Sequence, residues 1–344
     1  MGNNLEDIFE SIPPSPESAS DRPLYSVLPV PDHTSYFIGR DSENRACLLV
    51  ATSQGSSRVQ APIRLESLDV QFDLRCYLKR KGEGTQEGTF TVIRCRAADA
   101  ETMRYFLSVC NTIVRMVGDS PSRPKLASAV NRLAAIFQKM QKPPARSVNG
   151  LFGELYILWR SGNAVRTVNA WRLDDIARFD FSDGDVRMDV KATAGRLRVH
   201  TFSYEQCNPP PGTIAVVASL HVEQAAGGIA LRSIIEEIAS RIASQPDLVL
   251  KLHEVVAATL GTSLNEALAI RFDIKLAQSS LRFFSLDDVP AIRGSLPAGV
   301  SEVHFRSDVS TLSPMKTQVL IDRDPIFWDL LPREDDGSTR GMDC

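Results

Sequence analysis

The stretch "FDFSDGDVRMDVKAT", residues Phe179 to Thr193, places four aspartates and a lysine within two short runs of β-type residues. The two runs are joined by Ser-Asp-Gly, and Gly184 tolerates the positive φ that a tight hairpin turn requires. Because side chains alternate along a strand, Asp189 and Lys191 face one side while their apolar neighbours face the other. The stretch therefore predicts a hairpin that projects a carboxylate and an ammonium group together.

The preceding strand adds a second acid, because Asp180 and Asp189 would meet at neighbouring strand ends. Two carboxylates and a strand carbonyl form the hard-oxygen site that Mg²⁺ prefers, and Mn²⁺ accepts similar ligands. Lys191 beside such a site would orient a water and stabilise charge on a phosphate under attack. The alternative to a metal site is a solvated surface hairpin.

A third acid stands on a helix that is apolar on nearly every side. In "GLFGELYILWR", residues 150–160, helical spacing leaves Glu154 as the only acid, so the helix is predicted to be largely buried. A buried carboxylate is costly unless it is paired or hydrogen-bonded. Glu154 therefore needs a partner: a metal shared with Asp180 and Asp189, or a nearby arginine, unless it lies on an exposed edge of the helix.

Basic residues alternate along "RLRVHTF", which follows the hairpin. Arg196, Arg198 and His200 would share one strand face, and pairing with the Asp189 strand through a turn near Gly195 would set a cationic stripe beside the acids. Such a stripe suits a phosphate backbone, so these residues are candidates for DNA binding. The alternative is a solvated strand face.

The next motif, "SYEQ", combines Ser203 and Gln206 at the spacing of a capping box. Three prolines at 209–211 limit the helix to little more than one turn. Gln206 would then be free to point toward the acidic site, as an alternative to a purely structural role.

Composition narrows the classes of function. The chain has 344 residues, 43% hydrophobic and 24% charged, as expected of a globular protein large enough for two domains. Six cysteines without a CxxC pair indicate reduced thiols in a cytoplasm, and no apolar run approaches the roughly 20 residues of a membrane span. The net charge of −3 means that nucleic-acid binding would need a local basic surface. No nucleotide-binding glycine motif occurs.

Along the chain, β-type runs, helical spacing and proline-rich breaks predict an α/β (α+β) protein with a mixed central sheet flanked by helices, preceded by an antiparallel β-rich domain. Within the later part, short strands are expected from about Val165 to Phe202. The predicted segments are a mobile arm, a β-rich domain, a helical connector, a core and a β-rich extension with a polar tail, over residues 1–31, 32–97, 98–146, 147–290 and 291–344.

The order of a helical Glu, a strand-end Asp, D-x-K on the next strand, then a basic strand and a Gln resembles the PD-(D/E)xK nuclease superfamily. More narrowly, "GLFGELYILWR", "DVKAT" and "RVHTFSYEQ" look like an uncharacterised bacterial branch associated with phage-defence genes. The resemblance implies a restriction-endonuclease-like core, with Asp180 and Asp189 as metal-binding acids, Lys191 as the motif lysine, Glu154 as the helical acid and Gln206 as an accessory residue. Phe179 stands where the superfamily name has Pro. The spacing from Asp180 to Asp189 is short for this motif, so Asp183 or Asp185 is an alternative to Asp180 as the first metal-binding acid.

These features together predict a Mg²⁺-dependent endodeoxyribonuclease acting on DNA in a restriction or phage-defence system, alone, as an oligomer or with other subunits. The alternative is a catalytically silent or partner-dependent DNA-binding or scaffold subunit of a defence complex. A third interpretation is a structural protein in which the acids and Lys191 lie apart. Binding of Mg²⁺ or Mn²⁺ that depends on Asp189 would separate the nuclease from the scaffold subunit, and coordinates would decide the third interpretation.

Overall fold

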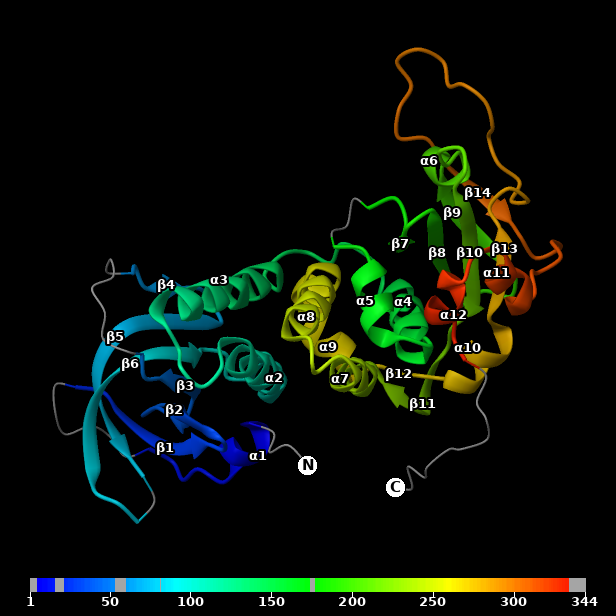
Figure 1. The fold of residues 1–344 in the computed structure, drawn as a ribbon. Coiled ribbons are helices and arrows are strands. Elements are labelled where there is room, and N and C mark those ends of the chain that lie inside the picture. Colours follow the sequence, from blue (N-terminus) through cyan, green and yellow to red (C-terminus); the bar gives the residue numbers. More distant parts are fainter. Residues whose placement is uncertain (1–4, 16–21, 53–59, 81, 174–176, 334–344) are drawn as a thin grey trace. The chain divides into compact units, whose positions relative to one another are not determined.

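The computed structural model describes residues 5–15, 22–52, 60–80, 82–173 and 177–333, and it divides into two compact units, Met1–Lys142 and Pro143–Cys344 (Figure 1). Each unit has its own sheet and helices. The finer division into five segments stays a prediction.

The first unit is a mixed β-barrel. Its strands are β1 (Leu24–Val30), β2 (His33–Arg40), β3 (Ala46–Val50), β4 (Ile63–Arg64), β5 (Leu68–Lys79) and β6 (Thr85–Cys95). The order is β1-β2-β3-β6-β5-β4 with antiparallel neighbours, and a parallel pairing of β1 with β5 closes the barrel. Apolar side chains such as Tyr25, Leu49 and Val92 fill its interior.

Two expectations for this region are corrected. The β-rich domain is mixed rather than antiparallel, because β1 runs parallel to β5. Helix α1 (Leu5–Glu10) and strand β1 lie where a mobile arm was expected over residues 1–31. Leu5 and Phe9 are buried, and Tyr25 of β1 belongs to the barrel core, so apolar contacts hold both elements in place.

The helical connector predicted over residues 98–146 contains α2 (Ala100–Val117) and α3 (Arg123–Lys139). Asp99 caps α2 by accepting a hydrogen bond from the Thr102 N–H at 2.7 Å. Gly118, at φ 78°, ends the helix in a conformation that suits glycine.

The second unit contains a four-stranded mixed sheet in the order β13-β10-β8-β7. Strands β8 (Val186–Thr193) and β10 (Ile214–His221) run parallel, while β7 (Phe181–Asp183) and β13 (Arg282–Ser285) are antiparallel to their neighbours. The hairpin predicted from Ser-Asp-Gly is confirmed, because Asp183 pairs with Val186 and Gly184 has φ 53°. Two smaller ribbons pair β11 (Gln224–Ala230) with β12 (Arg271–Phe272) and β9 (Val199–Ser203) with β14 (His304–Asp308).

Helix α4 (Val148–Arg160) covers one face of this sheet, as Figure 1 shows. Ser147 caps the helix by accepting a hydrogen bond from the Gly150 N–H at 3.1 Å. Gly153 lies against the sheet so closely that a Cβ placed there would be 3.1 Å from Val190 Cγ1 and 3.2 Å from the Ala192 Cβ. The residue after this contact is Glu154, so the packing fixes where that acid enters the unit.

The opposite face of the sheet is covered by the β9–β14 ribbon. Phe202 of β9 packs in a cluster with Val217 of β10 and Phe284 of β13. Asp189 and Lys191 lie on this face, because β8 and β10 are in register and Val217 stands beside Asp189. The sheet therefore separates a helical layer from a β layer.

The remaining helices correct parts of the β-rich expectation. Residues 164–170 form a helix where short strands were expected, and two helices, Thr317–Arg323 and Ile326–Leu330, lie in the predicted β-rich extension over residues 291–344. The helices of the second unit other than α4 are α5 (Ala164–Ala170), α6 (Tyr204–Cys207), α7 (Leu231–Arg241), α8 (Pro246–Leu260), η1 (Gly261–Ser263), α9 (Leu264–Ala269), α10 (Ile274–Ser280), α11 (Thr317–Arg323) and α12 (Ile326–Leu330). Short apolar runs do not distinguish a buried strand from a buried helix. The polar tail, residues 334–344, lies outside the described residues.

Across the described ranges, no helix is both long and apolar enough to cross a bilayer. The five cysteines within these ranges are free and buried.

The contact between α4 and the sheet gives a stability prediction. Gly153→Leu should lower the free energy of unfolding by about 1–3 kcal/mol, because the larger side chain must force α4 away from Val190 and Ala192. Urea unfolding measures the change. Gly227→Leu is the matched control, since a Cβ at Gly227 meets nothing within 4 Å. Equal effects of the two substitutions would show that the close approach of α4 is unimportant.

Candidate functional site

Glu154 is the most deeply engaged of the predicted acids. It is 2% exposed, and Arg172 holds it from two nitrogens, with Nε 2.9 Å from Oε2 and Nη2 3.3 Å from Oε1. The Trp171 Nε1–H donates to the same Oε2 at 2.7 Å. The expectation that Glu154 is buried and needs a partner is confirmed, and its main partner is an arginine.

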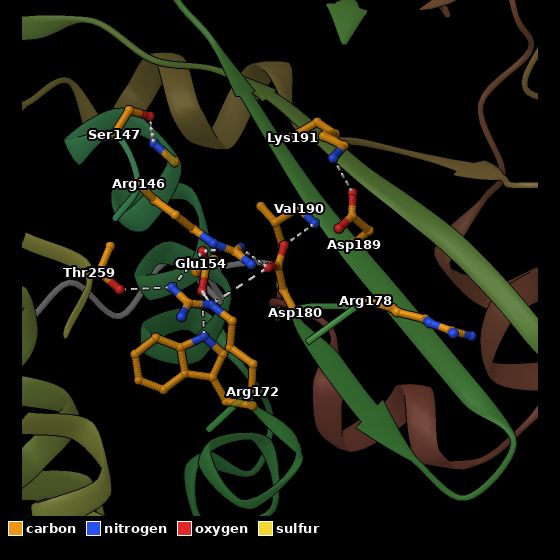
Figure 2. A network of polar contacts seen from close by, with 12 residues as sticks. Arg146, Ser147, Glu154, Arg172, Arg178, Asp180, Asp189, Val190, Lys191 and Thr259 are labelled. Carbon is orange, nitrogen blue, oxygen red and sulfur yellow. Dashed lines mark hydrogen bonds and ion pairs between the residues drawn. The ribbon is translucent and has the colours of Figure 1, made fainter. Parts of the chain in front are cut away.

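Arg172 is fixed as firmly as the acid that it binds. Its side chain is fully buried, and Nη2 also donates to Thr259 Oγ1 at 2.9 Å, at the end of α8 (Figure 2). Its backbone N–H donates to the Asp180 carbonyl at 2.7 Å. Arg172 thereby connects the acid of α4 with the segment that carries Asp180.

The two carboxylate oxygens of Asp180 have different partners, strand β8 and a second arginine. Oδ2 accepts a hydrogen bond from the Val190 N–H at 2.8 Å, and Oδ1 lies 2.8 Å from Arg146 Nη1. The same Nη1 is 3.6 Å from Glu154 Oε1. Figure 2 shows Arg146 between these two acids.

Asp189 forms a separate pair on the other face of β8. Its Oδ2 lies 2.7 Å from Lys191 Nζ, and its Oδ1 accepts a hydrogen bond from Gln206 Nε2 at 2.8 Å. The Oδ2 contact is an ion pair whose geometry falls short of a hydrogen bond. Lys191 Nζ also lies 5.1 Å from the centre of the Phe202 ring, a distance typical of a cation–π contact. The structure thus brings Asp189, Lys191 and Gln206 together.

Gln206 has both roles that its motif allowed. Its Oε1 accepts from the Ser203 N–H at 3.0 Å, while the Gln206 N–H donates to Ser203 Oγ at 3.1 Å, which completes a capping box. Its Nε2 remains available for Asp189 and for the Arg178 carbonyl, each at 2.8 Å.

Burial sets the electrostatics of the acids. Loss of solvent raises the pKa of Glu154 to about 7, with the charge of Asp180 adding to the rise and Arg172 and Arg146 opposing it. Burial likewise raises the pKa of Asp189 to about 6, opposed chiefly by Lys191. Burial alone lowers the pKa of Arg146, but the charges of Asp180, Glu154 and Asp189 raise it overall. All three acids therefore act on Arg146.

The acids do not form a ready metal centre in this arrangement. Within the described ranges, no group of three His, Cys, Asp or Glu side chains is placed to hold a metal ion. Side-chain cations take the positions around Glu154, Asp180 and Asp189 instead. Mg²⁺ requires several oxygen ligands at about 2.0–2.1 Å. The residues as they lie therefore do not fit the expected metal.

The alternative first ligands lie elsewhere. Asp183 Oδ2 is 2.6 Å from Arg166 Nε of α5, and Asp185 is exposed at the hairpin turn. Within the part of the chain that the structure describes, neither side chain bonds to Glu154 or Asp189. Asp180, in contrast, accepts a hydrogen bond from the strand that carries Asp189.

The predicted basic stripe is corrected. Strand β9 pairs with β14, not with β8, and it lies over the sheet so that Arg198 and His200 point inward. Arg198 Nη1 donates to the Ser219 carbonyl and to Ser219 Oγ, both at 2.7 Å. His200 is 5% exposed, and burial lowers its pKa to about 4, so the ring is neutral near pH 7. Arg196 alone of the three is exposed.

Arg196 borders an open cleft of about 670 Å³ at the ends of the parallel strands β8 and β10. Thr193, Asn149 and His221 also line this cleft. Ligands of open α/β sheets commonly bind outside the carboxyl ends of the strands. The cleft begins two residues beyond Lys191 on the same strand.

Two arginines of the network, Arg146 and Arg172, were not predicted from the sequence, and Trp171 was given no role in the site. The sequence did indicate that the buried Glu154 needs a cation. It did not indicate which arginine provides that cation, because the spacing of residues along the chain does not show which distant side chains meet.

Comparison with known proteins identifies the family of the chain. A family model described as "Putative PD-(D/E)XK family member" (DUF4420) matches residues 5–310, nearly the whole chain. Searches of curated proteins and of solved structures found no match. The chain therefore belongs to the DUF4420 family.

Proposed function

We propose that this protein is a divalent-metal-dependent endodeoxyribonuclease, with Mg²⁺ or Mn²⁺ as cofactor and a restriction-endonuclease-like core. The observation that carries the proposal is the Asp189–Lys191 pair, 2.7 Å apart on a buried strand face, with Asp180 bonded to the Val190 N–H between them, in a member of this family. A cytoplasmic role in restriction or phage defence, with DNA and partner subunits, belongs to the same proposal.

The side chains have distinct parts in this function. Lys191 stabilises negative charge on a phosphodiester under attack, because its ammonium is positioned by Asp189 and only partly exposed. Gln206 holds Asp189 from the other oxygen and so fixes the direction of the pair. Arg196 at the cleft offers a contact to the DNA backbone.

A second function, a partner-dependent or catalytically silent DNA-binding subunit, is favoured by one observation. Each of the three acids already has a side-chain cation, and no described group of acids is arranged for a metal. Such a subunit would bind DNA without cutting it at any metal concentration.

Cleavage of plasmid DNA tests the main proposal. With Mg²⁺ or Mn²⁺ titrated upward, the wild type should nick or linearise the plasmid, and Lys191→Ala and Asp189→Ala should each lose about 100-fold or more in rate, because charge stabilisation at the phosphate is removed. Arg187→Gln, on the same strand face but bonded to the Gly184 and Val186 carbonyls, is the matched control and should cut normally. Wild-type rates in Lys191→Ala would contradict the assigned role.

Gln206 can be separated from its capping role. Gln206→Leu should slow cleavage by about 10–100-fold, as expected when a residue that orients a working side chain is lost. Ser203→Ala breaks the same capping box without touching Asp189, so it should cost about 0.5–2 kcal/mol of stability but preserve the cleavage rate. Single-turnover rates and thermal unfolding of both variants give the comparison, and a matching loss of rate in Ser203→Ala would assign Gln206 to structure alone.

DNA binding should depend on Arg196. Arg196→Gln should weaken binding to all sequences and reduce the slope of log K against log salt by about 1, because one phosphate contact is lost. Fluorescence anisotropy of a labelled duplex at several salt concentrations measures this slope. Arg323→Gln, at an exposed arginine of α11, is the control. An unchanged slope in Arg196→Gln would remove this residue from the DNA interface.

A further inference from the structure

The guanidinium of Arg146 lies between two of the three predicted metal ligands, Asp180 and Glu154. Its Nη1 is 2.8 Å from Asp180 Oδ1 and 3.6 Å from Glu154 Oε1, and the charge of Asp189 also acts on it. Asp180 Oδ2 is already bonded to the Val190 N–H, so Oδ1 is the oxygen left to face a cation. Arg146 Nη1 is the nearer cation to that oxygen, because Arg172 Nε lies 3.8 Å from it (Figure 2).

Charge balance shows what a metal would have to do. Among six described side chains, the negative charges of Glu154, Asp180 and Asp189 are matched by Arg172, Arg146 and Lys191. Adding a divalent cation without removing a positive group would bring like charges together at low solvent exposure, which is unfavourable. One of the three cations must move.

Arg146 is the cation best able to move. Its side chain is 29% exposed, compared with 19% for Lys191 and 0% for Arg172. It stands in the non-helical segment before Ser147, where the Ala145 and Arg146 N–H groups donate to the Thr259 carbonyl. The backbone can stay anchored while the side chain turns toward solvent. Arg172, by contrast, also bonds Thr259 Oγ1 inside the unit.

We propose that Arg146 is an internal guard of the site: its guanidinium stands in for the divalent cation between Asp180 and Glu154, and a metal binds only after it leaves. This inference rests on the proposed function, since it concerns the same acids. Arg146 bridges Glu154 and Asp180, and no described group of three His, Cys, Asp or Glu side chains is placed to hold a metal while it does so.

A phosphate group supplies a natural reason for Arg146 to leave. Guanidinium groups bind phosphate oxygens through paired hydrogen bonds, so a DNA backbone at the site competes with Asp180 for Arg146. DNA binding and metal binding then support each other, because coupling between two ligands is reciprocal. The site stays closed to metal until its substrate arrives.

Mn²⁺ binding to the full chain tests the guard directly. Calorimetric titration of Arg146→Ala without DNA should show Mn²⁺ bound about tenfold or more tightly than by the wild type, within the usual range of coupled binding. Arg166→Ala is the matched control, because it also removes an arginine bonded to an aspartate of the same unit, Asp183 at 2.6 Å. An unchanged affinity in Arg146→Ala, or an equal gain in Arg166→Ala, overturns the proposal.

Free guanidinium ions added to Arg146→Ala show whether the Arg146 side chain blocks Mn²⁺ by filling its position or only by its positive charge. Low concentrations of guanidinium chloride should weaken Mn²⁺ binding to Arg146→Ala competitively, and NaCl at the same ionic strength should weaken it less. Equal effects of the two salts contradict a guanidinium-shaped position. If Arg146→Ala does not fold by circular dichroism, Arg146→Lys is used, which keeps one charge without the fork; it should still bind Mn²⁺ more tightly than the wild type, and no gain overturns the guard.

The same proteins separate this inference from the proposed function. Tighter Mn²⁺ binding by Arg146→Ala, without plasmid cleavage by any protein, supports the guard and rejects the nuclease. Cleavage by the wild type, with no gain of affinity in Arg146→Ala, supports the nuclease and rejects the guard. Absence of Mn²⁺ binding in every protein rejects the guard, since no metal site is then present to be guarded.

Discussion

The second unit depends on the burial of a carboxylate and of the guanidinium that neutralises it. Glu154 is 2% exposed and the Arg172 side chain is wholly enclosed, so neither charge has water as an alternative partner. Removing one member of such a pair lowers the free energy of unfolding far more than replacing both members with apolar residues, because the other charge is left buried and unpaired. The ion pair joins α4 to the segment after α5, and through Thr259 it reaches the end of α8. Three elements distant in sequence are therefore held at one point.

The sheet distributes the acids over its two faces, and this division shapes the chemistry. Glu154 comes from the helix that packs on Val190 and Ala192, whereas Asp189 and Lys191 project to the opposite face under Phe202. Asp180 connects the two sides, because its carboxylate accepts the backbone N–H of the residue between Asp189 and Lys191. A change in the position of Asp180 is thus transmitted to the strand that carries the pair.

The sequence predicted those features that depend on neighbours in the chain. Gly184 indicated the hairpin, the alternation of β8 placed Asp189 with Lys191, and the apolar surroundings of Glu154 indicated its burial; the structure confirms all three. The contacts that it did not predict join distant segments. Strand β9 finds β14 rather than β8, and the parallel pairing of β1 with β5 is equally non-local. Local alternation cannot specify such pairings, since it describes one strand at a time.

The same distinction separates the two kinds of cation at the site. Lys191 is two residues from Asp189 on one strand, so the backbone itself keeps the pair together, and their proximity could be inferred from the motif. Arg146 reaches Asp180 from a segment before α4, and only the fold makes them neighbours. The Asp189–Lys191 contact persists as long as strand β8 is folded. The contact of the partly exposed Arg146 with Asp180 can be exchanged for another ligand while the protein stays folded. The strand therefore fixes the Asp189–Lys191 pair, whereas in the proposed function a metal reaches Asp180 only when Arg146, which lies outside the motif, moves away.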